Sequence, residues 1–176
     1  MTKLLRLLPV AAVLTAAVAF PAMAGAAIST STNPANAPSG THFKSGSASC
    51  SVSGNVASCS QYTLAGVGNT DVTATLSATY TGTVVCINGG GNPSDSQHQG
   101  TFTSTSTSGT LQPKNGNVTV PSLSSTPPSE QQFLAQQTCP NPNWTPTLQG
   151  PITLQSFTYT VQFAGFSGPY ITITGP

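Results

Sequence analysis

Charged side chains are nearly missing from this sequence. Asp, Glu, Lys and Arg make up 4% of its residues, whereas about 25% is usual for a globular protein. Two lysines beyond the N-terminal region cannot neutralise a row of phosphates or hold the chain on an anionic lipid surface. We therefore expect neither nucleic acid nor an anionic membrane as a partner. Beyond residue 24 the charged residues are Lys44, Asp71, Asp95, Lys114 and Glu130.

Familiar catalytic and metal-binding patterns are also missing. The sequence has no Gly-x-Ser-x-Gly elbow and no Cys-x-x-Cys pair that His42 and His98 could complete as a metal site. His98 lies in the run 89–100 (GGGNPSDSQHQG), which we interpret as a flexible turn. Glu130 and Asp71 are isolated, so glycosidase chemistry has poor candidates. We expect no catalytic residue, no metal and no cofactor; the alternative is a secreted hydrolase or toxin whose site is assembled from distant residues.

The N-terminus has the layout of a secretory signal peptide. Lys3 and Arg6 precede an apolar run that ends at Phe20, and Ala22-Met23-Ala24 follows as a small-residue cleavage site. The alternative, a membrane anchor, is disfavoured because the uninterrupted apolar core is shorter than the roughly 20 residues that a bilayer requires. The sequence predicts cleavage after Ala24 and a secreted, extracellular chain with no membrane anchor after cleavage.

Composition divides the remaining chain into two parts. Residues 25–45 are small and polar, with Pro34 and Pro38 among them, and we expect a flexible N-terminal lead-in. Residues 46–176 show short alternating runs separated by turn residues. This length is enough for a single domain with its own core.

The clearest strand pattern runs from Val72 to Cys86. Apolar residues alternate with threonine and serine over this range, and Gly82 is the gap in the apolar face. A straight strand of this length would reach about 50 Å, which is long for a domain of this size. We therefore expect a bend or bulge near Gly82.

Further strand patterns indicate an all-β domain. Phe157, Tyr159, Val161 and Phe163 share one face of the run from Gln155 to Phe163, as expected for a core strand. Asn115-Gly116 is typical of a two-residue hairpin turn. The residues favour an antiparallel β-sandwich of about seven or eight strands. The other strand candidates are Ala48–Ser53, Val56–Leu64, Gly100–Leu111, Val118–Leu123 and Pro169–Thr174, and Ser129–Thr138 is the one helix candidate.

The four cysteines form an even set in a chain expected to be exported, and three pairings are open to them. A two-residue turn at Gly54-Asn55 would place Cys50 opposite Cys59 at a non-hydrogen-bonded position, where Cα atoms approach closely enough for a disulfide. Cys86 and Cys139 are then left to each other. Their bridge would close a loop worth about 4 kcal/mol in the chain-entropy model.

Trp144 is the candidate binding residue. It follows Cys139 in the proline-rich segment CPNPNWTP. One interpretation places the indole over the Cys86–Cys139 bridge, because sandwiches often pack tryptophan against a disulfide. The other is an exposed platform on which a sugar or a partner side chain stacks.

Two stretches resemble a known group of proteins. The run Thr79 to Asn92 (TYTGTVVCINGGGN), followed by CPNPNW from Cys139 to Trp144, resembles small exported actinobacterial proteins of unknown function. The resemblance implies an immunoglobulin-like sandwich and a Cys86–Cys139 bridge, and it implies no activity. The sequence thus predicts a secreted, disulfide-stapled, non-enzymatic β-sandwich. We expect a structural or binding role at the cell envelope or in the extracellular space, with an envelope glycan or protein as partner.

Overall fold

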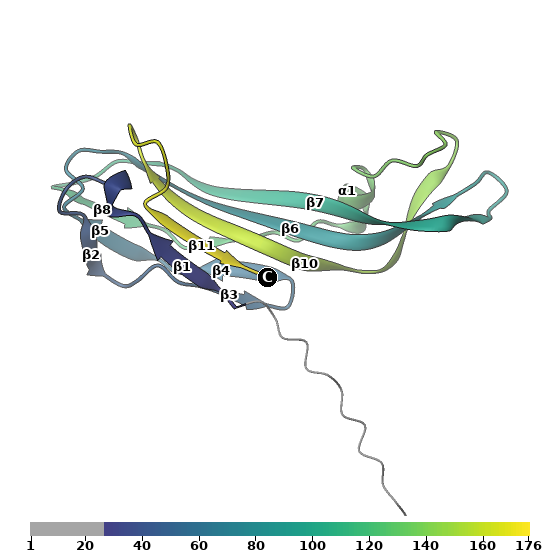
Figure 1. Ribbon diagram of the computed structural model, residues 1–176, viewed down its shortest axis with the longest axis horizontal. Helices are drawn as coiled ribbons and strands as arrows, with labels where there is room; N and C mark the ends of the chain where they lie inside the picture. Colours follow the sequence, from purple (N-terminus) through teal and green to yellow (C-terminus); the bar gives the residue numbers. More distant parts are fainter. Residues whose placement is uncertain (1–26) are drawn as a thin grey trace, which may run out of the picture.

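The computed structural model describes residues 27–176, apart from the side chains of residues 94–96 (Figure 1). The predicted signal peptide, residues 1–24, lies outside this part. No helix in the described range is long and apolar enough to cross a membrane. The strands are β1 (Ser29–Thr32), β2 (His42–Ser45), β3 (Cys50–Ser53), β4 (Val56–Cys59), β5 (Tyr62–Ala65), β6 (Val72–Ile87), β7 (Pro93–Leu111), β8 (Asn117–Val120), β9 (Leu123–Ser124), β10 (Thr145–Phe163) and β11 (Ile171–Gly175). A 3-10 turn, η1 (Pro34–Asn36), and one helix, α1 (Glu130–Leu134), complete the elements.

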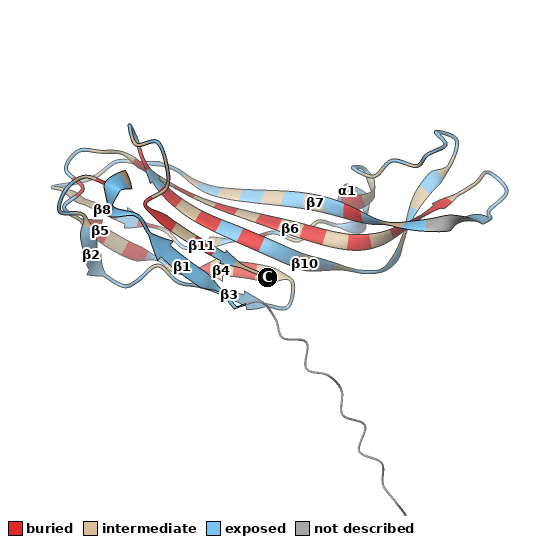
Figure 2. Cartoon of the chain, viewed as in Figure 1, coloured by how far each residue is buried: buried red, intermediate tan, exposed pale blue. Residues whose placement is uncertain are grey.

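The strands form one large sheet and two small ones. The large sheet has the order β1-β11-β10-β6-β7, and the small sheets have the orders β2-β5-β8 and β3-β4-β9. Every strand pair in them is antiparallel. Buried side chains from all three sheets form one core cluster, because one face of the large sheet packs against the small sheets (Figure 2). The largest members include Tyr62, Leu64, Leu76, Tyr80 and Tyr159.

Three long strands run along the length of the molecule (Figure 1). β6 has 16 residues, and β7 and β10 have 19 each. The two strongest strand predictions, Val72–Cys86 and Gln155–Phe163, are confirmed. Phe157, Tyr159 and Phe163 are buried as the alternation predicts.

The expected bend or bulge near Gly82 is not in β6 itself. Gly82 pairs with Gly100 of β7 without a register shift. The β6–β10 ladder has two register shifts, and the one between Gln149 and Thr153 lies opposite Gly82. Gly150, in that irregular segment, has φ 86°, a left-handed conformation that favours glycine. The predicted irregularity near Gly82 is therefore confirmed on the partner strand β10. The long strands continue past the small sheets as an arm (Figure 1).

This distal arm, comprising residues 82–87, 93–100 and 145–149, has its own small core. Val84, Val85 and Cys86 are buried there together with Phe133 of α1. An added Cβ on Gly82 would lie 3.2 Å from Phe133 Cζ, and one on Gly100 would lie 3.0 Å from Phe133 Cε1. The glycine pair therefore leaves the space that the Phe133 ring occupies. This contact is the physical reason for the gap in the apolar pattern.

The helix that carries Phe133 is short and well capped. The Ser129 hydroxyl accepts from the Gln132 N–H at 3.2 Å, and the Gln132 side chain accepts from the Ser129 N–H at 2.9 Å. This capping box satisfies two backbone donors at the helix start. The candidate Ser129–Thr138 thus contains a helix of five residues.

The described part of 25–45 differs from the predicted flexible lead-in. β1 pairs with β11, and β2 pairs with β5. The Asn33 N–H also donates to the Tyr170 carbonyl at 2.8 Å. Apolar alternation is absent from these two strands because they lie at sheet edges, where backbone hydrogen bonds hold them whatever their side chains are.

Several shorter predictions need correction at their boundaries. Val56–Leu64 is two strands, β4 and β5, because the chain crosses between the small sheets after Cys59. Val118–Leu123 is divided in the same way between β8 and β9. The glycine-rich run 89–100 is a loop only up to residue 92, since Pro93 begins β7 and pairs with Ile87. Eleven strands are therefore present in the described residues, more than the seven or eight predicted.

Both predicted tight turns are confirmed. Ser53 pairs with Val56 across Gly54-Asn55. Asn115 and Gly116 have φ values of 52° and 71°, the positive angles that a type I′ hairpin turn requires. A bridge between Lys114 and Asn117 closes this second turn.

Candidate binding surface

The two histidines and Glu130 lie on three different elements of the described part of the chain. No cluster of three or more His, Cys, Asp or Glu residues that could hold a metal ion occurs there. His42 is exposed on β2, and Glu130 is exposed on α1. His98 is half-buried on β7 and lines a shallow depression that does not include Glu130. The structure does not bring His98 and Glu130 together in this depression, and the hydrolase alternative stays a prediction.

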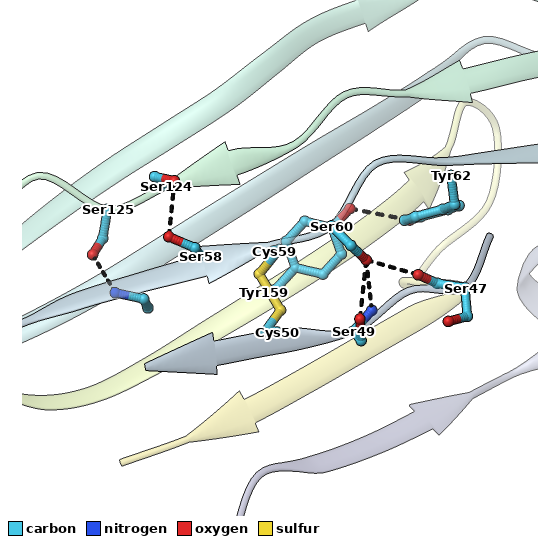
Figure 3. Close-up of a disulfide and its surroundings, with 11 residues drawn as sticks. Ser47, Ser49, Cys50, Ser58, Cys59, Ser60, Tyr62, Ser124, Ser125 and Tyr159 are labelled. Atoms are coloured by element: carbon cyan, nitrogen blue, oxygen red, sulfur yellow. Dashed lines mark hydrogen bonds between the residues drawn. A yellow bond between two sulfur atoms is a disulfide. The ribbon is translucent and has the colours of Figure 1, made fainter. Parts of the chain in front are cut away.

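Both predicted disulfides are present. Cys50 pairs with Cys59 across β3 and β4, with the Cα atoms 4.0 Å apart, in the register counted from the Gly54-Asn55 turn (Figure 3). Cys86 is joined to Cys139, with a Cα separation of 5.8 Å. The second bridge ties the loop after α1 to the distal arm. It lies beside His98, Thr138 and Pro140 in a depression of about 400 Å³.

Trp144 lies just before β10 and is half-buried. The backbone N–H of Trp144 donates to the Asn141 carbonyl at 3.0 Å and closes a turn. The residues that line the depression beside the Cys86–Cys139 bridge do not include it. Intermediate exposure fits neither a fully covered core tryptophan nor a fully open platform. Both interpretations of Trp144 stay predictions.

The tyrosines that could have formed an aromatic groove are inside the protein. The Tyr62 and Tyr159 hydroxyls are hydrogen-bonded at 3.0 Å in the core (Figure 3). Burial, and after it the neighbouring Tyr159, raises the pKa of Tyr62 far above its ordinary value. Burial also raises the pKa of Tyr159 and that of Tyr170. These groups stay neutral at ordinary pH and support packing rather than proton transfer.

A regular array of hydroxyl side chains covers the solvent side of the large sheet. The alternate residues of β6 are buried, so its threonines point away from the core and align with hydroxyl residues on neighbouring strands. Two rows cross all five strands, and two rows cross three strands. We call this array the threonine face. Its rows are Thr107-Thr75-Thr160-Thr172-Ser31, Thr105-Ser77-Thr158-Thr174-Ser29, Thr103-Thr79-Ser156 and Thr101-Thr81-Thr153.

The spacing of the threonine face follows from sheet geometry. Neighbours in a row are about 4.8 Å apart across the strands, and successive rows are about 6.7 Å apart along them. The members on β7 are exposed, as are Thr153 and Thr158 of β10. Exposed and half-buried positions alternate along β7 (Figure 2). Every member of the array is uncharged, so it offers hydroxyl groups and methyl groups alone. Alternation along Val72–Cys86 revealed one column of this array, but the rows depend on strand register.

No protein-family model matches this chain, and neither a curated protein nor a solved structure matches it. The geometry of the threonine face is therefore the basis of the functional proposal below.

Proposed function

We propose that this chain is a secreted, non-enzymatic β-sandwich protein of the immunoglobulin-like kind, with a structural or binding role at the cell envelope or in the extracellular space. Its contact surface in this proposal is the threonine face, and its partner is an uncharged one. A neutral glycan of the envelope is the class that we would test first.

The observation that carries this proposal is the threonine face itself. Four rows of hydroxyl side chains lie in register on one sheet, and they can donate and accept hydrogen bonds with a polymer that also carries hydroxyls. A charged ligand would find no opposite charge there. A non-enzymatic role is supported by the described residues, among which no three or more His, Cys, Asp or Glu side chains gather, because a catalytic centre needs titratable groups that converge.

Secretion is supported by the signal-peptide pattern and by two disulfides, which persist in oxidising compartments. Sequencing the N-terminus of protein recovered from culture medium tests this step. We expect the recovered chain to begin at Gly25. An uncleaved chain retained in the cell would contradict secretion.

The binding role is tested by cosedimentation with two insoluble polymers, protein-stripped cell walls and cellulose. The test variant is Thr153→Lys with Thr158→Lys, which puts charge on two exposed members of the threonine face. The matched control is Ser51→Lys with Thr119→Lys, which adds the same charge at exposed positions of β3 and β8. We expect affinity for at least one polymer to fall about tenfold in the test variant, the loss of roughly one or two hydrogen bonds, and to stay unchanged in the control.

Two results would overturn the proposal. One is a wild-type chain that sediments with neither polymer. The other is turnover of a hydrolase substrate by the purified chain that disappears in His98→Ala or Glu130→Gln, since this would establish the enzyme alternative.

A further inference from the structure

One edge of the large sheet is long and unpaired within the described residues. β7 is the last strand in the order β1-β11-β10-β6-β7, and its ladder is with β6. It follows the rim of the molecule over most of its length (Figure 1). At the opposite edge, β1 has four residues and is followed by Pro34.

The contacts of β6 show which backbone groups of β7 face outward. The Ala74 N–H donates to the Ser108 hydroxyl, and the Ala74 carbonyl accepts from the Thr107 hydroxyl, so even-numbered residues of β6 direct their backbone toward β7. In an antiparallel ladder hydrogen-bonded and non-hydrogen-bonded pairs alternate. Thr101, Thr103, Thr105 and Thr107 oppose odd-numbered β6 residues, and their N–H and C=O groups therefore point off the edge.

Two features bound the free part of this edge. The Gln137 amide donates to the Thr101 carbonyl at 3.0 Å and so covers the distal end. A register shift between Thr107 and Thr110 interrupts the ladder at the other end. The free segment between them is Thr103-Ser104-Thr105-Ser106-Thr107, which reads the same in both directions.

Between Thr103 and Thr107 the edge lacks the devices that usually prevent pairing, because the register shifts of β7 lie outside this segment. Natural sheets protect edge strands with charge, proline, bulges or short length. From Gln97 to Leu111 the sequence contains no Asp, Glu, Lys, Arg or Pro. The free edge of β10 differs, because it carries Pro146 within the distal arm and Pro151 just beyond it.

We propose that β7 is a self-association edge at which a second copy of this chain pairs antiparallel about a two-fold axis through Thr105. This register places Thr103 opposite the partner's Thr107, Ser104 opposite the partner's Ser106, and the two Thr105 residues opposite each other. It forms about six backbone hydrogen bonds, two for each outward-facing pair. Threonine and serine pairs directly across strands are favourable.

The palindromic sequence of this edge and its lack of charge favour a second copy of this chain as the partner. A palindromic edge can pair with itself in an isologous dimer, which uses both copies of β7 and leaves neither of them free to extend a filament. An uncharged edge brings no like charges together at the axis. The pair would also join the two threonine faces into one continuous surface, although the dimer does not depend on what that surface binds.

The test is sedimentation equilibrium of the purified, oxidised chain over a concentration series. We expect a wild-type monomer–dimer equilibrium whose dissociation constant rises at least about tenfold in Thr105→Pro. Proline removes the N–H at the axis but no bond to β6, because that N–H faces outward. Thr105→Lys should weaken the dimer similarly by opposing two charges, and added salt should partly restore it.

A control variant and a hydrogen-exchange measurement separate pairing at the β7 edge from other effects of added charge. Thr158→Lys adds the same charge to the threonine face away from the edge, and it should leave the dimer intact. In wild type, amide hydrogen exchange at Thr103, Thr105 and Thr107 should slow as concentration rises. A wild-type chain that stays monomeric at all concentrations would overturn the inference. So would a dimer that persists in both folded Thr105 variants, whatever the result of the polymer assay.

Discussion

Gly82 lies directly opposite Gly100 on neighbouring strands, and the ring of Phe133 occupies the space beside both of them. Phe133 is fully buried although α1 has five residues. The glycine pair thus anchors the helix, and through it the loop that carries Cys139, to the distal arm.

Filling this space should destabilise the protein. Gly82→Val would press on Phe133 and on Leu148, whose Cδ1 atom already lies 3.0 Å from an added Cβ. We expect the free energy of unfolding to fall by about 1–3 kcal/mol, as overpacking usually costs. Chemical denaturation measures this. Gly89→Val is the control, because a Cβ there meets no atom within 4 Å, and an equal loss in both variants would contradict the packing argument.

The two disulfides should contribute unequally to stability. Their sequence separations are 9 residues for Cys50–Cys59 and 53 residues for Cys86–Cys139. In the chain-entropy model these loops are worth about 2.5 and about 4 kcal/mol. We expect Cys86→Ala with Cys139→Ala to lower the denaturation midpoint further than Cys50→Ala with Cys59→Ala. The reverse order would contradict the explanation by loop length.

The buried tyrosine pair should make the protein sensitive to alkali. The pKa of Tyr62 is raised in the fold from its ordinary value of 10.0, because burial disfavours the phenolate. Below pH 10 the hydroxyl is protonated in both the folded and the unfolded chain, and this group gives no pH dependence. As the pH rises above 10, the unfolded chain releases the proton first, and the free energy of unfolding should decline.

Urea denaturation at a series of pH values measures this decline. Tyr62→Phe with Tyr159→Phe should have a shallower slope above pH 10 than wild type. Equal slopes would mean that other groups cause the decline in the free energy of unfolding above pH 10.

Ser125 links β4 to the buried Tyr80 by hydrogen bonds, and substituting Ser125 should destabilise the fold. Its hydroxyl accepts from the Ala57 N–H at 3.0 Å and from the Tyr80 hydroxyl at 2.8 Å, and its side chain is buried. Ser125→Ala removes the acceptor for both donors, at a cost of about 1–3 kcal/mol for each donor left unsatisfied.

A thermodynamic cycle tests this explanation. Tyr80→Phe with Ser125→Ala should cost less than the sum of the single variants, because the double variant leaves one fewer donor without a partner. Ser122→Ala, at an exposed position, should be close to neutral. Strict additivity would show that the Tyr80 hydroxyl bond contributes little.

Local patterns in the sequence determined much of the secondary structure. The alternation of Val72–Cys86 and Gln155–Phe163 determined two strands and their buried faces, since successive side chains of a strand point to opposite faces of the sheet. The Gly54-Asn55 turn fixed the register of Cys50 with Cys59, and Asn115-Gly116 fixed a second turn. These features depend on neighbours in the chain, and the sequence contains them directly.

Only the tertiary structure decided the features that depend on distant segments. The sequence could not show that β1 pairs with β11, that Phe133 needs the glycine pair, or that hydroxyl residues of five strands align in rows. Each of these depends on strand register and sheet order, which are set by packing and backbone pairing between residues far apart in the chain. Alternation assigns a side chain to a face of its strand, and the fold decides which other side chains share that face.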